Sequence, residues 1–381
     1  MLLKTIKHII LVLSVITISI SCNNKKEVTE INIGYIGPLT SRAADLGIAP
    51  SQAMKLAIEE YNSSKNESQP KINLFIQDGR WEKDAVLPAY KKLRKEHDID
   101  VIFISNSEGI LDIQDRILED GVIAVNPLDN DKSLSSLNKN TFKIAKSTEE
   151  AHRIVGVRII ELGLKKALIL HFPNNFMTIA ANSIQEILSE NNVENKVISV
   201  AKDQTDFTEI LKNAQAENTD AYVFLGYNDF GFAMKQARDL GIEENFFGST
   251  TLLDPEFYKN SEGTIVGTEC SFFTPLDGNY ILANKFLKDF EKRFGDEPFS
   301  IWPPMQAYDA MNIVINQLKL VNEDKKEKES LGDWLRNRLF QVRYYQGICG
   351  NISITEDGSS RGIYFSLYKV EPEGELGKIH L

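Results

Sequence analysis

The chain has 381 residues, of which 42% are hydrophobic and 25% are charged. This length is enough for two domains with separate cores, and the composition is typical of a globular protein. The formal net charge is −11. Proteins that bind nucleic acids neutralise phosphates with a basic surface, so this charge argues against a nucleic-acid partner.

The N-terminal segment has the layout of an export signal. Lys4 and Lys7 form a positive head, and an apolar stretch interrupted only by Ser and Thr follows at 9–20. This stretch is shorter than the roughly 20 apolar residues that a membrane-spanning helix needs. We therefore predict a signal peptide at 1–21 and a polar tether at 22–29 before the fold begins.

Cys22 lies at the predicted cleavage point. A cysteine at this position resembles the bacterial lipoprotein signal, in which the cysteine is lipidated and becomes the mature N-terminus. Such signals usually have Leu three residues earlier, whereas this chain has Ser19. The alternative is an ordinary signal peptide that leaves Cys22 as a free thiol. A lipidated Cys22 would hold the protein at a membrane of the bacterial cell envelope, on the extracytoplasmic side.

After the tether, short β-rich runs alternate with amphipathic helical patterns. The expected strands are near-continuous apolar runs, which is typical of parallel strands buried on both faces. The first series consists of strands at 31–37, 71–78, 100–105 and 122–127 and of helices at 51–62, 84–97 and 108–119. These β-α repeats predict an α/β lobe around a parallel sheet.

A second series of the same plan follows. It consists of helices at 148–162, 178–190, 207–216 and 230–240 and of strands at 165–172, 196–203, 221–227 and 246–250. No linker rich in Pro, Gly or Ser separates the two series. We therefore expect two lobes joined by ordered crossings, which would move as a hinge.

The C-terminal part returns to helices and then to strands. Helical patterns occur at 281–294, 305–321 and 331–340, and β-like segments occur at 350–355 and 362–370. The residues Asp357 and Gly358 between these two segments are typical of a turn. Cys270 and Cys349 are expected to be buried thiols, although a disulfide between them stays open.

Motifs of several enzyme classes are missing. The chain contains no Gly-x-Gly-x-x-Gly after its first strand, no Walker loop, no His-Glu-x-x-His and no Cys-x-x-Cys. Of the five histidines, His171 lies at the end of an expected strand, where a ligand-facing residue would be. A structural histidine is the alternative interpretation. We therefore expect a protein that is not an enzyme and has no catalytic residue, no metal site and no cofactor.

Five segments in order carry a resemblance to a known family. They are INIGYIGPLT, AMKLAIEEYN, TDFTEILKNAQAENTDAYVFLGY, AMKQARDLGI and QAYDAMNIVINQL. From Ile31 to Tyr368 the chain resembles the type I periplasmic substrate-binding proteins, especially the branched-chain amino-acid (Leu/Ile/Val) binding group that serves ABC importers.

The resemblance implies an α/β fold with two Rossmann-like lobes joined by three hinge crossings. The first lobe is expected at 30–146 and 276–346, and the second at 147–275 and 347–381. A ligand cleft is expected between the lobes, at the carboxyl ends of the parallel strands.

The resemblance also implies which residues bind the ligand. They are Thr40, Ser41, Asn106, Ser107, Leu128 and Asn130 in the first lobe and Phe176, Tyr227 and Thr250 in the second. At the positions of Asn106 and Ser107 the family usually has two small hydroxyl residues, which hold a ligand carboxylate; the amide of Asn106 still donates. Phe176 and Tyr227 would cover the ligand, although each is also explained as an ordinary loop-packing ring.

The chain departs from the family after the strand at 246–250. Amino-acid binders have an acidic side chain there, which pairs with the ligand ammonium, whereas this chain has Ser249 and Thr250. Burying an ammonium without an anionic partner is strongly unfavourable. Asp129 or Asp229 could substitute. The ligand is therefore an amino acid, or else a related carboxylate, an amide or another small polar molecule. Arg42 could bind an anionic group, or it is a solvated surface residue.

These features together predict a monomeric, lipid-anchored binding protein of the cell envelope. It would capture a small polar ligand by hinge closure and deliver the ligand to an ABC permease in the membrane. One alternative is a ligand-sensing module of the same fold that reports to another protein. Another is a degenerate binding protein whose cleft holds no small ligand. An enzyme on this scaffold is a further alternative, which no motif found here favours.

Overall fold

The computed structural model describes residues 27–40, 43–130, 134, 137–201, 204–253, 255–273, 280–295, 301–374 and 376–379. The predicted signal peptide, Cys22, Ser41 and Arg42 lie outside these residues, and so does the side chain of Thr250.

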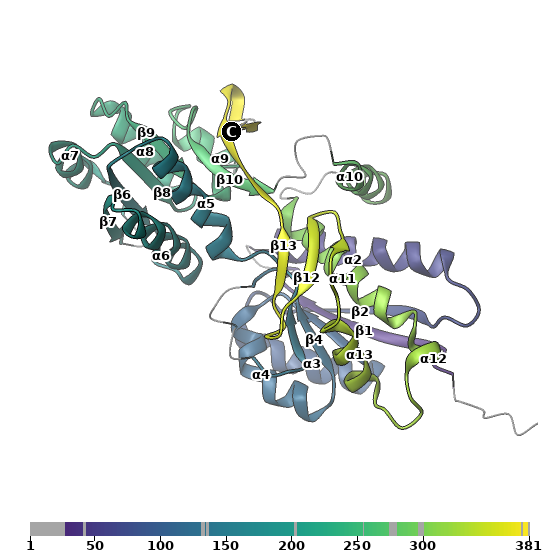
Figure 1. The fold of residues 1–381 in the computed structure, drawn as a ribbon. Coiled ribbons are helices and arrows are strands. Elements are labelled where there is room, and N and C mark those ends of the chain that lie inside the picture. The colour runs from purple at the N-terminus through teal and green to yellow at the C-terminus, as the bar shows by residue number, and fades with distance from the viewer. Residues whose placement is uncertain are drawn as a thin grey trace, which may run out of the picture.

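The first lobe is built on a five-stranded sheet with the order β2-β1-β3-β4-β5, in which all neighbouring strands are parallel (Figure 1). Its strands are β1 (Glu30–Gly37), β2 (Lys71–Asp78), β3 (Val101–Ile104), β4 (Ile123–Asn126) and β5 (Thr141–Lys143). Every residue of β3, β4 and β5 is buried. Helices on both faces exclude water from these strands, and the sequence therefore shows continuous apolar runs there.

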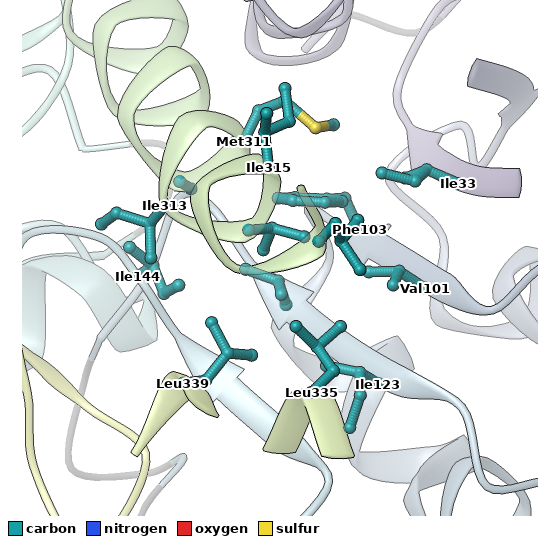
Figure 2. Packing of buried hydrophobic residues seen from close by; sticks show 14 of the residues in the cluster. Ile33, Val101, Phe103, Ile123, Ile144, Met311, Ile313, Ile315, Leu335 and Leu339 are labelled. Atoms are coloured by element: carbon teal, nitrogen blue, oxygen red, sulfur yellow. The ribbon is translucent and has the colours of Figure 1, made fainter. Parts of the chain in front are cut away.

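Two sets of helices cover the two faces of this sheet. One face is covered by α2 (Asp45–Ser64), α11 (Trp302–Leu318), α12 (Val321–Asp324) and α13 (Leu331–Leu339), and the other by α3 (Lys83–His97) and α4 (Ser107–Glu119). Figure 2 shows Phe103 and Ile123 of the sheet close to Ile315 and Leu335 of the first set, and all four are fully buried or nearly so. Burying one such side chain stabilises the fold by about 1.5–3 kcal/mol.

The second lobe contains a seven-stranded sheet with the order β15-β14-β10-β9-β8-β6-β7. Its strands are β6 (Lys166–His171), β7 (Glu194–Ser199), β8 (Ala221–Leu225), β9 (Asn245–Gly248), β10 (Glu269–Phe273), β14 (Phe365–Val370) and β15 (Leu376–Lys378). The five strands from β7 to β10 in the sheet are parallel, and β14 and β15 add an antiparallel edge. Its helices are α5 (Thr148–Glu161), α6 (Asn175–Glu190), α7 (Thr208–Ala216), α8 (Phe230–Asp239) and α9 (Pro255–Asn260).

The predicted helices are confirmed, with shifts at their ends. The largest shift is in α2, which begins at Asp45 although Pro50 follows within its first turns. Pro50 is the sixth residue of this helix and has no N–H group, so one hydrogen bond within the helix is missing there. The short helix α9 and the 3₁₀ turn η2 (Thr250–Leu253) were not predicted, because neither is long enough to show a periodic apolar pattern.

The lobes are joined where the chain passes between them three times (Figure 1). It leaves the first lobe between β5 and α5, returns between β10 and α10 (Ile281–Phe294), and leaves again through a small antiparallel sheet. This small sheet consists of β11 (Tyr345–Gln346), β12 (Gly350–Ile354) and β13 (Ser360–Ile363). The α/β fold of two lobes with parallel sheets confirms the expected architecture.

The third passage is assigned by its packing. Ile352 and Ile354 of β12 belong to the same buried cluster as the first sheet, whereas β14 extends the second sheet. A single residue, Tyr364, separates β13 from β14. We therefore propose that the chain changes lobe at Tyr364, whereas the expected division placed this change at residue 347.

Cys270 and Cys349 are both free and buried, as expected. Cys270 lies in the core of the second lobe, and Cys349 packs among residues of α2, α10 and α11 on the first. In the part of the chain that the structure describes, no helix is long and apolar enough to cross a membrane.

Candidate functional site

The loop after β1 is attached to the end of β2 through Asp78. The backbone N–H of Leu39 donates to Asp78 Oδ1 at 2.8 Å, and Thr40 Oγ1 donates to Asp78 Oδ2 at 2.5 Å. Burial raises the pKa of Asp78, but these hydrogen bonds lower it more, so the pKa lies below its usual value. Thr40 therefore has a structural role that its sequence position did not reveal, and its hydroxyl oxygen can still accept a hydrogen bond.

The ends of β3 and β4 meet through a buried amide. Asn126 is fully buried, and its Oδ1 accepts the backbone N–H groups of Leu128 at 2.9 Å and Asp129 at 3.0 Å. Its Nδ2 donates to Ser107 Oγ at 3.0 Å, and Ser107 donates in turn to Asp129 Oδ2 at 2.5 Å. The structure thus brings Ser107 and the loop of Leu128 together, and the Asp129 carboxylate of this loop contacts Ser107.

Asn106 and Asn130, two further predicted residues, are held by the fold as well. Asn106 is the N-cap of α4, and its Oδ1 accepts the N–H of Gly109 at 2.7 Å. This use explains an amide where a hydroxyl residue was expected, because Asn and Ser both cap helices well. Asn130 Nδ2 donates to the carbonyl of Ser360 at 2.8 Å, and its buried Oδ1 has no hydrogen-bond partner among the described residues.

The aromatic residues of the second lobe lie around the first turn of α6. Phe176 is partly buried in this turn, and Asn174 caps the helix by accepting the N–H of Met177 at 2.8 Å. Asn174 Nδ2 donates to the hydroxyl of Tyr227 at 2.9 Å, which places the loop after β8 beside the loop after β6. Tyr227 is 41% exposed. Both predicted rings therefore lie at the carboxyl end of the second sheet.

A buried lysine lies between the lobes. Lys146 follows β5 in the first passage and is 3% exposed. Its Nζ is 5.0 Å from the ring centroid of Phe176 and 5.0 Å from that of Trp302, which is the first residue of α11. Cations at such distances from aromatic faces are attracted by the ring quadrupole. The ammonium of Lys146 therefore lies between a ring of the second lobe and a ring that begins a first-lobe helix.

Two buried polar side chains adjoin Lys146. Gln306 Oε1 accepts the backbone N–H of Lys146 at 2.5 Å, and its Nε2 has no hydrogen-bond partner among the described residues. His152 contacts Phe176 edge-on, with 5.6 Å between ring centroids. Its Nδ1 lies 2.8 Å from the Thr148 carbonyl, and its Nε2 has no partner in the described part of the chain. Burial lowers the pKa of His152 to about 4, so the ring is neutral at pH 7.

The loop after β9 presents hydroxyl groups. Ser249 and Thr251 share a hydrogen bond of 2.6 Å between their side-chain oxygens, and Thr251 Oγ1 donates to the carbonyl of Gly226 at 2.6 Å. Asp229, one of the acids considered as a substitute, is exposed at the start of α8. The other, Asp129, lies beside Ser107.

Other candidate features do not form a site. His171 is buried, and its Nδ1 lies 3.0 Å from the Phe172 carbonyl, so it is a structural residue. A Gly-x-Ser-x-Gly pattern does occur at 358–362, but Ser360 is 3% exposed and exchanges hydrogen bonds with both backbone groups of Ala145. This serine is no exposed nucleophile. The described residues contain no group of three or more His, Cys, Asp or Glu that could hold a metal.

One small cavity lies away from these strand ends. It has a volume of about 70 Å³ and is lined by Lys166, Lys196 and Glu217, among others. Ligand sites usually enclose roughly 300–1,000 Å³. Lys166 begins β6, so the cavity is at the opposite end of that strand from Phe176, and we do not consider it a ligand site.

Of the predicted residues, Ser107 and Leu128 are brought together by Asn126, and Phe176 and Tyr227 by Asn174. Four residues here were not predicted from the sequence: Lys146, His152, Trp302 and Gln306. The position of Lys146 three residues after β5, where a ligand-facing loop begins, was the signal available for it. Nothing in the sequence placed residue 306 beside residue 146.

Two α/β lobes, three passages between them and polar groups at facing strand ends define a two-lobed binding protein. The sequence profile described as "Periplasmic binding protein" matches residues 30–371. The chain belongs to this family, and its fold is that of the type I members. This family consists of solute-binding proteins that act outside the cytoplasm.

Two relatives support the assignment. The chain is 21% identical to the Leu/Ile/Val-binding protein BraC3 of Rhizobium johnstonii over 357 residues, which is 92% of this chain and 93% of the relative. It is 20% identical to the Leu/Ile/Val-binding protein homolog 3 of Brucella melitensis over 244 residues, which is 62% of this chain and 66% of the relative.

Solved structures share the fold at low sequence identity. The leucine binding protein LivK of Thermotoga maritima has a TM-score of 0.75 at 18% identity, with 92% of this chain and 98% of that chain covered. LivJ of Streptococcus pneumoniae in complex with isoleucine has a TM-score of 0.70 at 18% identity, with 92% of this chain and 100% of that chain covered. A solute binding protein of Rhodopseudomonas palustris in complex with 3,4-dihydroxybenzoic acid has a TM-score of 0.73 at 19% identity, with 92% of this chain and 96% of that chain covered.

Proposed function

We propose that this protein is a lipid-anchored solute-binding component of an ABC importer. It captures a small polar ligand between its lobes and delivers it to a permease, acting as a monomer and without covalent chemistry. The observation that carries this proposal is the meeting of both lobes at Lys146, with the buried polar atoms of Gln306 and His152 beside it.

The proposed capture of the ligand takes place by hinge closure. A ligand that contacts Ser107 in one lobe and Phe176 or Tyr227 in the other stabilises the closed state by the contacts that only this state provides. Because the lobes are connected by three short passages, closure requires changes in few backbone angles.

The structural neighbours indicate the class of ligand. One is described in complex with isoleucine and another with 3,4-dihydroxybenzoic acid. These two compounds share a carboxyl group on a small skeleton. We therefore propose a small carboxylate as the ligand, with its carboxyl group beside the ammonium of Lys146 and near the loop of Leu128.

Thermal unfolding tests the binding function. The chain beginning after Cys22 keeps every described residue, and it would be heated with a panel of amino acids, hydroxy acids, amides and sugars. A ligand at about 100 times its Kd stabilises the protein by roughly 2.7 kcal/mol, which shifts Tm measurably. Ser107→Ala should remove the shift, while Ser63→Ala on the exposed end of α2 should keep it. No shift with any compound would contradict the proposal.

The anchor is tested separately. We expect the full chain, expressed in a bacterium, to fractionate with membranes and to have its N-terminus at a lipid-modified Cys22. Mass spectrometry of the N-terminal peptide measures the added lipid. Cys22→Ser should release the protein from membranes. An unmodified Cys22 in the mature protein would contradict the anchor and leave the binding function standing.

A further inference from the structure

The site between the lobes already contains an ammonium group. Lys146 is 3% exposed, and its Nζ lies 5.0 Å from each of the ring centroids of Phe176 and Trp302. A desolvated cation between aromatic faces is attracted by the quadrupole of each ring. The aromatic surface that would favour a ligand ammonium is therefore used by the side chain of the protein itself.

Asp129, the nearby acid, already interacts with Ser107 and Lys146. Burial raises the pKa of Asp129, and the hydrogen bond from Ser107 at 2.5 Å and the positive charge of Lys146 offset this only in part. An arriving ammonium would have to share this carboxylate with Lys146, and two cations close to one acid repel each other.

The second lobe supplies no compensating acid at the usual position. Ser249 and Thr250 occupy the place where amino-acid binders have a carboxylate, and the hydroxyl of Ser249 is hydrogen-bonded to that of Thr251. His152, the ionisable residue beside Phe176, is neutral at pH 7. An amino-acid ligand would consequently bury its ammonium without a protein carboxylate dedicated to it, which is strongly unfavourable.

The buried polar atoms that have no hydrogen-bond partner among the described residues fit a different ligand. Gln306 Nε2 is a hydrogen-bond donor, which suits a carboxylate. Since the Nδ1 of neutral His152 faces the Thr148 carbonyl and must carry the proton, its Nε2 is an acceptor, which suits a hydroxyl group. A carboxylate also complements the charge of Lys146.

We propose that the site selects small carboxylates that carry no ammonium group, and that it prefers a 2-hydroxy acid to the amino acid of the same skeleton. This inference rests on the proposed binding function. Lys146 and Gln306 contact the carboxylate, and His152 accepts the hydrogen bond of the hydroxyl group.

Titration calorimetry on the chain beginning after Cys22 tests this selection with matched pairs. The probes are 2-hydroxy-4-methylpentanoate against leucine, and 3-phenyllactate against phenylalanine. We expect the hydroxy acid of at least one pair to bind with a Kd lower by at least about tenfold, which corresponds to about 1.4 kcal/mol. Tighter binding of the amino acid would overturn the selection while leaving the binding function intact. No heat with any of the four would overturn the selection, while the wider panel of the thermal screen decides the binding function.

Variants assign the residues. Lys146→Met keeps an unbranched apolar body but removes the charge, and it should weaken hydroxy-acid binding by about tenfold or more. Lys146→Arg should keep most of the affinity, and Lys165→Met, at an exposed position, should keep all of it. His152→Phe should remove the preference for 2-hydroxy-4-methylpentanoate over 4-methylpentanoate. Circular dichroism checks that each variant is folded. Unchanged binding by a folded Lys146→Met would overturn the role of Lys146.

Discussion

The ammonium of Lys143, at the end of β5, lies 3.5 Å from Asp357 Oδ2 in the turn between β12 and β13, 214 residues later. Lys143 is 1% exposed, and its backbone N–H donates to the carbonyl of Gly358 at 2.8 Å. The first and third passages between the lobes are thereby joined at the edge of the first sheet. This connection holds the two segments together at that edge.

Asp357→Asn should destabilise the protein at neutral pH. Burial raises the pKa of Asp357, but hydrogen bonds from Thr355 and Ser359 and the charge of Lys143 lower it more, so the pKa lies well below its usual value. The carboxylate therefore stabilises the fold above the unfolded-state pKa of about 4, and this contribution is lost as the pH falls below it. Removing one partner of a buried pair costs roughly 3–5 kcal/mol, and half-exposure of Asp357 reduces this to about 1–2.

Urea unfolding at neutral and acidic pH measures this effect. The difference between wild type and Asp357→Asn should be largest at pH 7 and should shrink towards pH 3. Glu356→Gln, at the exposed neighbouring position, should differ little from wild type at either pH. A difference that does not change with pH would rule out the carboxylate charge as its cause.

Gly47→Ala should disturb the loop between β1 and α2. A Cβ at Gly47 would collide with the carbonyl group of Pro38. This group belongs to the backbone, so it cannot move unless the loop shifts. Tyr35 also donates a hydrogen bond to the Gly47 carbonyl at 3.2 Å. Overpacking of this kind costs about 1–3 kcal/mol. Chemical denaturation gives the value, with Lys55→Ala on an exposed face of the same helix as the control. Unaltered stability would mean that the loop and helix separate easily.

Asn126→Ala should reduce both stability and ligand affinity. The side chain makes three buried or partly buried hydrogen bonds, to Ser107, Leu128 and Asp129. Its loss leaves backbone N–H groups without acceptors, which we expect to cost about 3 kcal/mol in unfolding free energy. The loop of Leu128 and Asp129 loses its anchor, so affinity for any ligand found in the thermal screen should fall.

Asn213→Ala, on an exposed face of α7, provides the matched control for Asn126. It should leave both quantities near the wild-type values. Retained affinity in a destabilised Asn126→Ala protein would show that the loop keeps its shape without this amide.

The two internal cysteines should resist thiol reagents in the folded protein. Burial raises the pKa of Cys270 to about 12 and raises that of Cys349 strongly. Thiolates are the reactive form, so neither residue should react at pH 8. In the chain beginning after Cys22, a colorimetric disulfide reagent should find both thiols after unfolding in urea and none before. Rapid reaction of the native protein would show that one core opens readily.

Helices and strands were predicted well because each has a characteristic pattern of apolar residues in the local sequence. Buried parallel strands are apolar throughout, as in β3, and long helices such as α10 repeat apolar residues at helical spacing. The segment 362–370 shows the limit of such patterns. It reads as one β-like run, yet β13 pairs with β12 while β14 pairs with β10 in the other lobe. The choice of partner strand depends on contacts far away in sequence.

Part of the candidate site could likewise be predicted from the sequence, and part could not. The loops after strands could be identified because parallel strands in one sheet end at the same edge, whereas Ser107 and Phe176 were expected from the family resemblance. Lys146, Trp302 and Gln306 could not, because they come from segments more than 150 residues apart. Their proximity results from the return of the chain to the first lobe between β10 and α10.

The sequence by itself determined that this is an α/β protein of two lobes, that β-α units alternate in order, and that a carboxylate is missing after β9. These properties depend on residue types and their spacing, which are local. Only the tertiary structure decided that Asn126 links the ends of β3 and β4, and that the ammonium of Lys146 lies between Phe176 and Trp302. Those relationships require distant segments to pack against each other, so they arise only once both lobes have formed.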